Sequence, residues 1–175
     1  DIKQTPTYSM RTLAFHEAIP GHHLQVALNL ENEQLSLYRR FGYGTSAFTE
    51  GWALYAERLA LEIGLANNPY DELGILQSEL FRAVRLVVDT GIHFNRWTRE
   101  EAMKYMKKVT GMSDTEVTSE IERYIVWPGQ ACSYKVGMLK ILELREKAKQ
   151  ELGESFDIRD FHSAVLDHGE PPLFI

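Results

Sequence analysis

Two histidine positions and a glutamate lie close together near the start of the chain, in residues 15–25, which read FHEAIPGHHLQ. Imidazole and carboxylate groups are zinc ligands, and in the motif His-Glu-x-x-His the glutamate activates a metal-bound water. The position where that motif places its second histidine is occupied by Pro20. Proline removes a helical hydrogen bond and Gly21 relaxes the backbone, so we expect a kink or widened turn between His16 and His22.

Either His22 or His23 can supply the second imidazole. On an undistorted helix of about 3.6 residues per turn, His23 would lie about 20° from His16 and His22 about 240° away. If Pro20 and Gly21 act as a two-residue insertion, His22 takes the ligand position over a shorter span. We favour His22 as the ligand, which leaves His23 to face the substrate or to support the ligands.

A third protein ligand is needed for a catalytic zinc ion that keeps one open position. The best candidate is Glu50, near the start of an expected second helix in residues 45–57, TSAFTEGWALYAE. Gly51 beside it would let another backbone approach closely. Glu57, seven residues later on the same helix face, is the alternative. The pattern predicts one zinc ion held by His16, His22 and Glu50.

Both motifs resemble those of domain-of-unknown-function family 885, a group of mostly bacterial uncharacterised proteins. The likeness continues through residues 85–93 (RLVVDTGIH), 127–137 (WPGQACSYKVG) and 161–162 (FH), and covers nearly the whole chain. The resemblance implies a relation to helical, gluzincin-type zinc peptidases with a glutamate as third ligand, and no particular substrate. Family members are several times longer, which implies that residues 1–175 are the C-terminal, metal-bearing part and that helices of the missing N-terminal part close the cleft.

The composition fits one globular domain. The chain has 175 residues, of which 44% are hydrophobic and 25% charged, so we expect residues 1–175 to form a single helical domain. A net charge of −6 argues against a nucleic-acid partner. No apolar stretch approaches the roughly 20 residues of a membrane span. Cys132 is single, and a signal peptide or lipid anchor would lie upstream, so the bacterial compartment, cytoplasmic or exported, stays open.

Helical periodicity predicts an all-α fold. The expected helices cover residues 9–30, 46–63, 70–95, 98–109, 113–127, 131–152 and 158–167, and residues 38–44 are expected to be a loop. Two of them carry apolar stripes that we expect to be core. These stripes are Leu13, Ile19, Leu24, Ala27 and Leu28 in the first helix, and Leu73, Leu76, Leu80, Val84, Val87 and Val88 in the long one.

Four further side chains have two interpretations each. Tyr134, near the start of its helix, is either an oxyanion donor or a buried tyrosine with a satisfied hydroxyl. Arg85, Asp89 and His93 share one helix face. They form either an internal ion pair with a capping histidine, or a group in which Asp89 orients a ligand imidazole and His93 contacts the substrate or transition state.

The sequence therefore predicts a zinc-dependent hydrolase of peptide bonds, in which Glu17 takes a proton from the bound water and passes it to the leaving amine. Carboxypeptidase or dipeptidase action is preferred by analogy with enclosed helical clefts. Arg85 and Arg145 are candidates to bind the substrate, although an exposed salt bridge also suits Arg145; His23 and His162 are further candidates. The alternatives are a non-catalytic, metal-stabilised or binding domain, and a zinc amidase or esterase.

Overall fold

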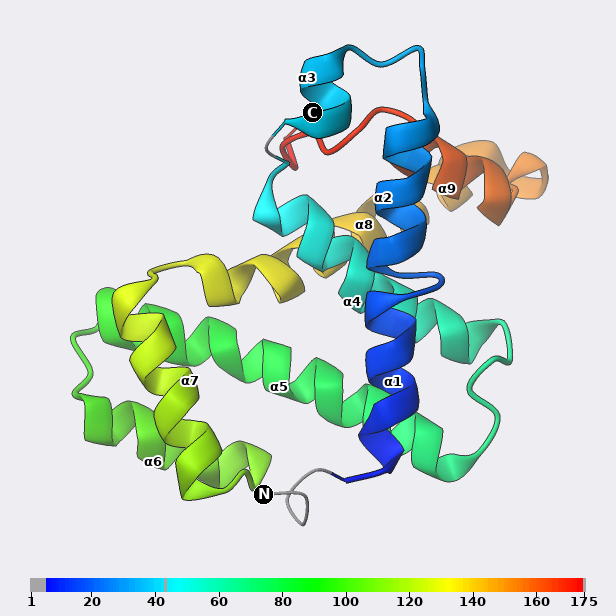
Figure 1. Ribbon diagram of the computed structural model, residues 1–175. Helices are drawn as coiled ribbons and strands as arrows, with labels where there is room; N and C mark the ends of the chain where they lie inside the picture. Colours follow the sequence, from blue (N-terminus) through cyan, green and yellow to red (C-terminus); the bar gives the residue numbers. More distant parts are fainter. Residues whose placement is uncertain (1–5, 43, 175) are drawn as a thin grey trace.

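The computed structural model describes residues 6–42 and 44–174, and within these ranges the chain is all-α, as the sequence predicted (Figure 1). None of the helices in these ranges combines the length and apolar character that crossing a membrane requires. The helices are α1 (Tyr8–Glu17), α2 (His22–Glu31), α3 (Leu37–Phe41), α4 (Ser46–Glu62), α5 (Pro69–His93), α6 (Arg99–Thr110), α7 (Asp114–Val126), α8 (Ser133–Leu152) and α9 (Ile158–Leu166), with short 3-10 turns at Gln130–Cys132 and Gly153–Ser155.

Local capping signals explain where several helices begin. Thr98 with Glu101 and Ser113 with Glu116 form complete capping boxes at the starts of α6 and α7. The Asp157 side chain accepts a hydrogen bond from the first turn of α9. These caps account for helix starts that the sequence predicted near residues 98, 113 and 158.

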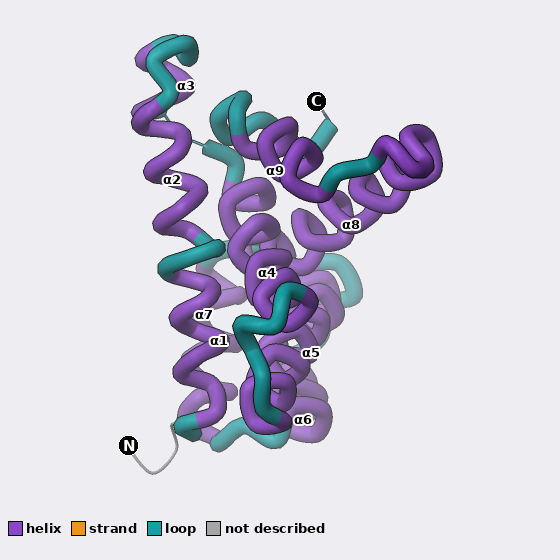
Figure 2. Tube along the Cα trace, turned by 90° about the vertical axis from the view of Figure 1, so that its right-hand side faces the viewer, coloured by secondary structure: helices purple, strands orange, loops and turns teal. Residues whose placement is uncertain are grey.

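The first predicted helix, residues 9–30, is divided into two. α1 ends at Glu17 and α2 begins at His22, and the two helices stack end to end along one side of the molecule (Figure 2). Gly21 packs against the end of α1 so closely that a Cβ atom there would lie 1.9 Å from the carbonyl oxygen of His16. The indole of Trp52 fixes the connection to α4 by donating a hydrogen bond of 2.9 Å to the carbonyl of Pro20. The expected bend is confirmed, as a complete break that returns the chain towards His16.

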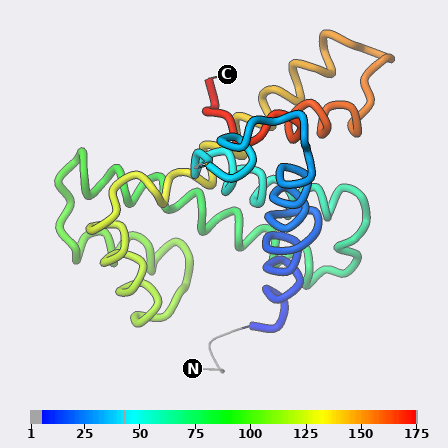
Figure 3. Tube along the Cα trace, turned by 45° about the horizontal axis from the view of Figure 1, so that its top comes forward, coloured from blue at the N-terminus to red at the C-terminus, as the bar shows by residue number. Residues whose placement is uncertain are grey.

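Two hydrophobic clusters hold the remaining helices together. One joins α4, α8 and α9 and includes Trp52, Tyr55 and Met138. The other joins α5, α6 and α7 around Val88 and Ile121. Figure 3 shows α6 and α7 at one end of the molecule and α9 at the other, with α8 leading between them.

The crossing of α4 and α8 depends on two glycines. A Cβ atom on Gly137 would lie 1.8 Å from the carbonyl oxygen of Ala47, and one on Gly51 would lie 2.4 Å from the Cα atom of Gly137. The sequence predicted a close backbone approach at Gly51, and it is confirmed. The crossing also fixes the position of the neighbouring residue, Glu50.

The prediction that both apolar stripes are core is wrong in part. On the first stripe, Leu13 is 55% and Ile19 59% exposed, whereas the polar residues Thr12 and His16 of α1 are buried. On α5, Val84 and Val88 are buried, but the other four members of the stripe are exposed: Leu73, Leu76, Leu80 and Val87. The physical reason is that the polar side of α1 packs against α4 and α5, which turns its apolar side outward.

A short helix occupies part of the segment that was predicted to be a loop. α3 covers Leu37–Phe41 and is capped by the Ser36 side chain, which accepts a hydrogen bond from the amide of Arg39. The loop prediction is wrong for residues 38–41, because the Ser36 cap was overlooked. Tyr43, in the same segment, lies outside the described residues.

Candidate metal centre

Three side chains from three helices converge where α1 ends and α2 begins. His16 comes from the last turn of α1, His22 from the first residue of α2 and Glu50 from the start of α4. One ligand atom from each lies within 4.8 Å of the others. The Glu50 carboxylate is 3.7 Å from His16 Nε2 and 3.3 Å from His22 Nε2. Ligand atoms around a tetrahedral zinc ion are about 3.4 Å apart, so the group fits a shared cation after a small contraction.

The second nitrogen of the His16 imidazole is held by a buried carboxylate. His16 Nδ1 lies 2.7 Å from Glu57 Oε1, and the two side chains are 4% and 1% exposed. If Nδ1 donates its proton to Glu57, the lone pair of Nε2 points towards Glu50, as a metal ligand requires. Glu57 was weighed from the sequence as an alternative metal ligand; in the structure it pairs with His16 instead.

The two carboxylates and the two imidazoles shift one another's pKa values. Burial lowers the pKa of His16, but the neighbouring carboxylates of Glu50 and Glu57 outweigh this effect and the net pKa is raised. Burial works against ionisation of Glu50 as well, yet the neighbouring side chains of His16, His22 and Tyr134 lower its pKa to about 2. Glu50 is therefore ionised at neutral pH and presents a charged oxygen ligand.

Tyr134 completes the wall of this site from the first turn of α8. Its ring stacks on the imidazole of His16, with ring centres 6.1 Å apart, and its hydroxyl helps to lower the pKa of Glu50. The guanidinium of Arg85 covers the same ring, 4.7 Å from its centre. These contacts hold the aromatic ring next to the metal group.

One side of the group is open. No fourth histidine, cysteine, aspartate or glutamate joins the three ligands in the part of the chain that the structure describes. The His22 and Glu50 side chains remain 23% and 19% exposed. Glu17, which follows His16, is exposed and has no hydrogen-bonding or ionic partner among residues 6–42 and 44–174. Three protein ligands with an open side are typical of catalytic zinc sites, whereas structural sites are closed by four.

Comparison with known proteins identifies the family. The profile of a family described as "Bacterial protein of unknown function (DUF885)" matches residues 1–175, the whole chain. The chain belongs to this family. No curated protein matched this DUF885 chain.

Two solved structures are similar to the DUF885 chain. One is described as "the putative lipoprotein from Colwellia psychrerythraea", with 55% identity, a TM-score of 0.95, and coverage of 99% of this chain and 30% of the other. The second, described as a "putative lipoprotein of unknown function from Shewanella oneidensis", has 32% identity and a TM-score of 0.88, over 96% of this chain and 30% of its own. The chain thus spans about a third of the length of these relatives.

The structure does not bring Arg85, Asp89 and His93 together with the metal group of the DUF885 chain. Arg85 pairs with Glu120 of α7 at 3.0 Å, and Asp89 accepts a hydrogen bond from the amide of Gly129. His93 Nε2 lies 2.9 Å from the carbonyl oxygen of Tyr124, to which it donates. Arg85 and His93 thus tie α5 to α7, and Asp89 ties α5 to the turn after α7; the ion pair is formed with Glu120 rather than within the predicted group.

Two other predicted substrate contacts, Arg145 and His162, are also apart from His16, His22 and Glu50. Arg145 pairs with Glu62 at 2.7 Å and donates to the hydroxyl of Tyr55. The same hydroxyl lies 2.8 Å from His162 Nε2, so these four residues form a cluster between α4, α8 and α9. His23 is exposed on the first turn of α2, beside the ligand His22.

Sequence reasoning missed two residues near the ligands. Glu57 was considered as a metal ligand, whereas in the structure its partner is His16. Its position two turns after Glu50 does place both carboxylates on one face of α4. Arg82 received no functional assignment from the sequence. Its guanidinium lies over the ring of Tyr134, 5.6 Å from the ring centre. No local signal in the sequence distinguishes an arginine that pairs from one that does not.

Proposed function

We propose that this chain carries the catalytic centre of a zinc-dependent hydrolase of peptide bonds. The observation that supports the proposal most directly is the convergence of His16, His22 and Glu50, with ligand atoms within 4.8 Å and one open side. Two imidazoles and one carboxylate form a donor set that suits zinc. A zinc ion held there would polarise a scissile carbonyl and acidify a water molecule.

The protein's own groups have separate tasks in this reaction. Glu57 orients the His16 imidazole through the 2.7 Å contact at Nδ1. Glu17, exposed and without a partner in the described chain, takes the proton of the attacking water and delivers it to the leaving amine. The hydroxyl of Tyr134, beside Glu50, donates to the oxygen that becomes negative as the carbonyl is attacked.

The remaining part of the longer protein is the proposed intramolecular partner. Both solved relatives are about three times the length of this chain. Met10 and Leu13 of α1, together with Ile19 just after it, form an apolar face in which each side chain is more than half exposed. Burial of such side chains is favourable by about 1.5–3 kcal/mol each. Coverage of this face by the missing N-terminal part would also form the second wall of the substrate cleft.

The substitution Glu17→Gln tests the proposal in the full-length protein. It keeps the size of the side chain and removes the base, so hydrolysis of a peptide substrate should fall at least about 100-fold. Bound zinc, measured by elemental analysis, should remain at one per chain. Glu31→Gln, at the exposed end of α2, is the matched control and should leave both quantities unchanged.

Two results would contradict the proposal. Equal activity of wild type and Glu17→Gln would exclude Glu17 as the base. Bound zinc without hydrolysis of any peptide, amide or ester would instead indicate a metal-stabilised binding domain.

A further inference from the structure

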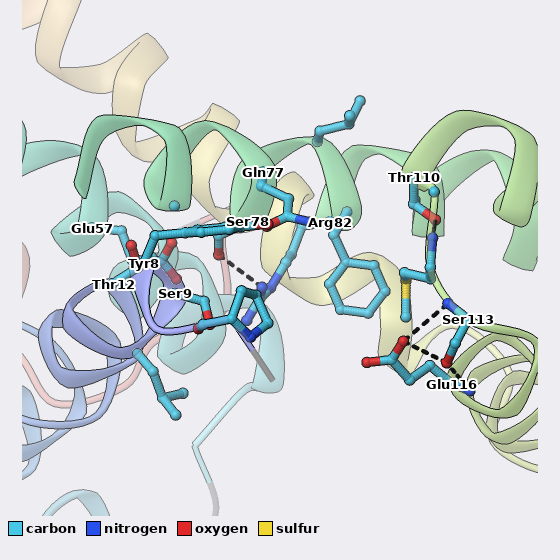
Figure 4. Close-up of a pocket in the computed structure, with 17 residues that line it drawn as sticks. Tyr8, Ser9, Thr12, Glu57, Gln77, Ser78, Arg82, Thr110, Ser113 and Glu116 are labelled. Atoms are coloured by element: carbon cyan, nitrogen blue, oxygen red, sulfur yellow. Dashed lines mark hydrogen bonds between the residues drawn. The ribbon is translucent and has the colours of Figure 1, made fainter. Parts of the chain in front are cut away.

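A cavity lies directly behind the metal group. It has a volume of about 570 Å³, is open to solvent on one side, and is lined by α1, α5, Glu57 of α4 and the connection from α6 to α7. Figure 4 shows Tyr8, Thr12 and Glu57 on one side, Thr110 and Ser113 on the other, and Arg82 between them. The volume is within the roughly 300–1,000 Å³ of small-ligand sites. Because Glu57 both lines the cavity and pairs with His16, the cavity begins where the metal group ends.

Polar atoms around this cavity lack partners. Thr12 Oγ1, Glu57 Oε2 and Arg82 Nε are buried side-chain atoms without a hydrogen-bond partner, and all three residues line the cavity. Buried polar atoms without a partner are uncommon in native proteins. The three residues make this wall of the cavity polar, although these particular atoms are covered by neighbouring protein atoms.

Arg82 sets the charge that this occupant should have. Its guanidinium donates one hydrogen bond, of 2.7 Å, to Ser78 Oγ, and no carboxylate lies within 4.0 Å of it among the described residues. The other arginines that approach the interior are paired: Arg85 with Glu120 and Arg145 with Glu62. Burial lowers the pKa of Arg82, and the more distant carboxylates Glu57 and Glu50 act in the opposite direction without reversing the shift, so no direct ion pair offsets the cost of burying this cation. An anionic group in the cavity would remove that cost.

The position of Arg82 relative to the ligands suits a short peptide. Arg82 lies over the ring of Tyr134, and that ring stacks on His16, so one aromatic ring separates the guanidinium from the imidazole. An extended residue spans about 3.3–3.6 Å. A peptide with its scissile carbonyl at His16, His22 and Glu50 therefore needs only a few residues to place its end at Arg82.

We infer that Arg82 binds the C-terminal carboxylate of the substrate, so that the hydrolase releases residues from the C-terminal end of short peptides. The planar guanidinium matches a carboxylate through two parallel hydrogen bonds. Ser78 orients the guanidinium, and Thr12 offers a hydroxyl at the same cavity. This inference rests on the proposed hydrolase function. It adds which residue binds the substrate and which end of the peptide is bound, neither of which follows from the metal group alone.

The test compares two substrates that differ only at the C-terminus, with full-length, zinc-loaded protein. One is an N-blocked alanine tripeptide with a free carboxylate, and the other is the same peptide with a C-terminal amide. Wild-type protein should prefer the free carboxylate by about 100-fold in kcat/KM, since the amide would leave the guanidinium without its charged partner. Arg82→Gln should abolish that preference, and Arg82→Lys should restore part of it.

Two further variants guard against a folding artefact. Ser78→Ala removes only the hydroxyl that orients Arg82 and should reduce the preference several-fold without unfolding the protein. Arg99→Gln removes an exposed arginine of α6 and should keep the wild-type preference. An unchanged preference in both Arg82→Gln and Ser78→Ala, or wild-type protein that hydrolyses both peptides equally, would overturn the inference.

A binding measurement separates this inference from the hydrolase proposal. Calorimetry with metal-free protein should show the free-carboxylate peptide binding at least about tenfold more tightly than the amide, and Arg82→Gln should remove the difference. That result without any hydrolysis would support Arg82 and refute the hydrolase. Hydrolysis without any carboxylate preference in binding or in kcat/KM would support the hydrolase and refute the assignment of Arg82.

Discussion

Glu57 should control zinc affinity although it does not touch the ion. Its carboxylate lies 2.7 Å from Nδ1 of His16 and is almost completely buried, so water cannot replace it. It fixes the ring orientation and makes Nε2 more basic. Substitution of carboxylates that hold ligand histidines typically costs 10–100-fold in metal affinity.

Two substitutions of Glu57 separate charge from orientation. Glu57→Gln keeps the size of the side chain and an oxygen that accepts the Nδ1 proton, so only the charge is lost. We expect zinc to bind about 10-fold more weakly, equivalent to about 1.4 kcal/mol. Glu57→Ala also frees the imidazole to rotate, and we expect about a 100-fold loss. Urea unfolding should show that Glu57→Gln remains folded.

The assay is competition for zinc with a chromophoric chelator at neutral pH. Glu62→Gln is the matched control, because Glu62 lies on the same helix and pairs with Arg145 rather than with a ligand histidine. It should bind zinc like the wild type. If Glu57→Gln and Glu57→Ala both retained wild-type affinity, the contact with His16 would not support metal binding, and the site would have to be reinterpreted.

Three further predictions concern the ligands, the helix crossing and pH. His22→Ala should weaken zinc binding by at least about 100-fold in the same assay, whereas His23→Ala should not; the reverse order would identify His23 as the ligand. Gly137→Ala should lower the free energy of unfolding by about 3 kcal/mol, because the added Cβ atom meets the backbone of Ala47. The measurement is the urea midpoint, and an unchanged midpoint would exclude this close crossing. Burial raises the pKa of Tyr55 to about 12. The neutral hydroxyl should therefore contribute fully to the free energy of unfolding below pH 10, and up to about 3 kcal/mol should be lost as the pH rises towards 12. Urea midpoints measured against pH should show this decline in the wild type and a smaller one in Tyr55→Phe.

Helix positions were predictable because their signals are local. The capping residues Thr98 and Ser113 and the periodic apolar residues each act within one or two turns. Which face of a helix is buried depends on everything that surrounds it. Leu13 was expected in the core because an apolar stripe normally seeks one, but its surroundings in this chain leave it exposed.

The ligands were more predictable than their support. His16, His22 and Glu50 were selected by residue type and spacing, and the structure brings these three together. The environment of Arg82 was not predictable, because the lack of a carboxylate near an arginine is a property of the tertiary packing. Which of His22 and His23 lies beside His16 also required the structure, since it depends on how Gly21 packs against the carbonyl of His16.

The arrangement of the two carboxylates on α4 explains why the site can exist before a metal binds. Glu50 and Glu57 are two helical turns apart, and they approach opposite nitrogens of the same buried imidazole. A shift of α1 along α4 by one turn, about 5.4 Å, would remove both contacts at once. It would also leave Glu57 buried without a partner, which is strongly unfavourable. The pairing therefore fixes the register of the two helices, and the same register places His16 beside Glu50 for the ion.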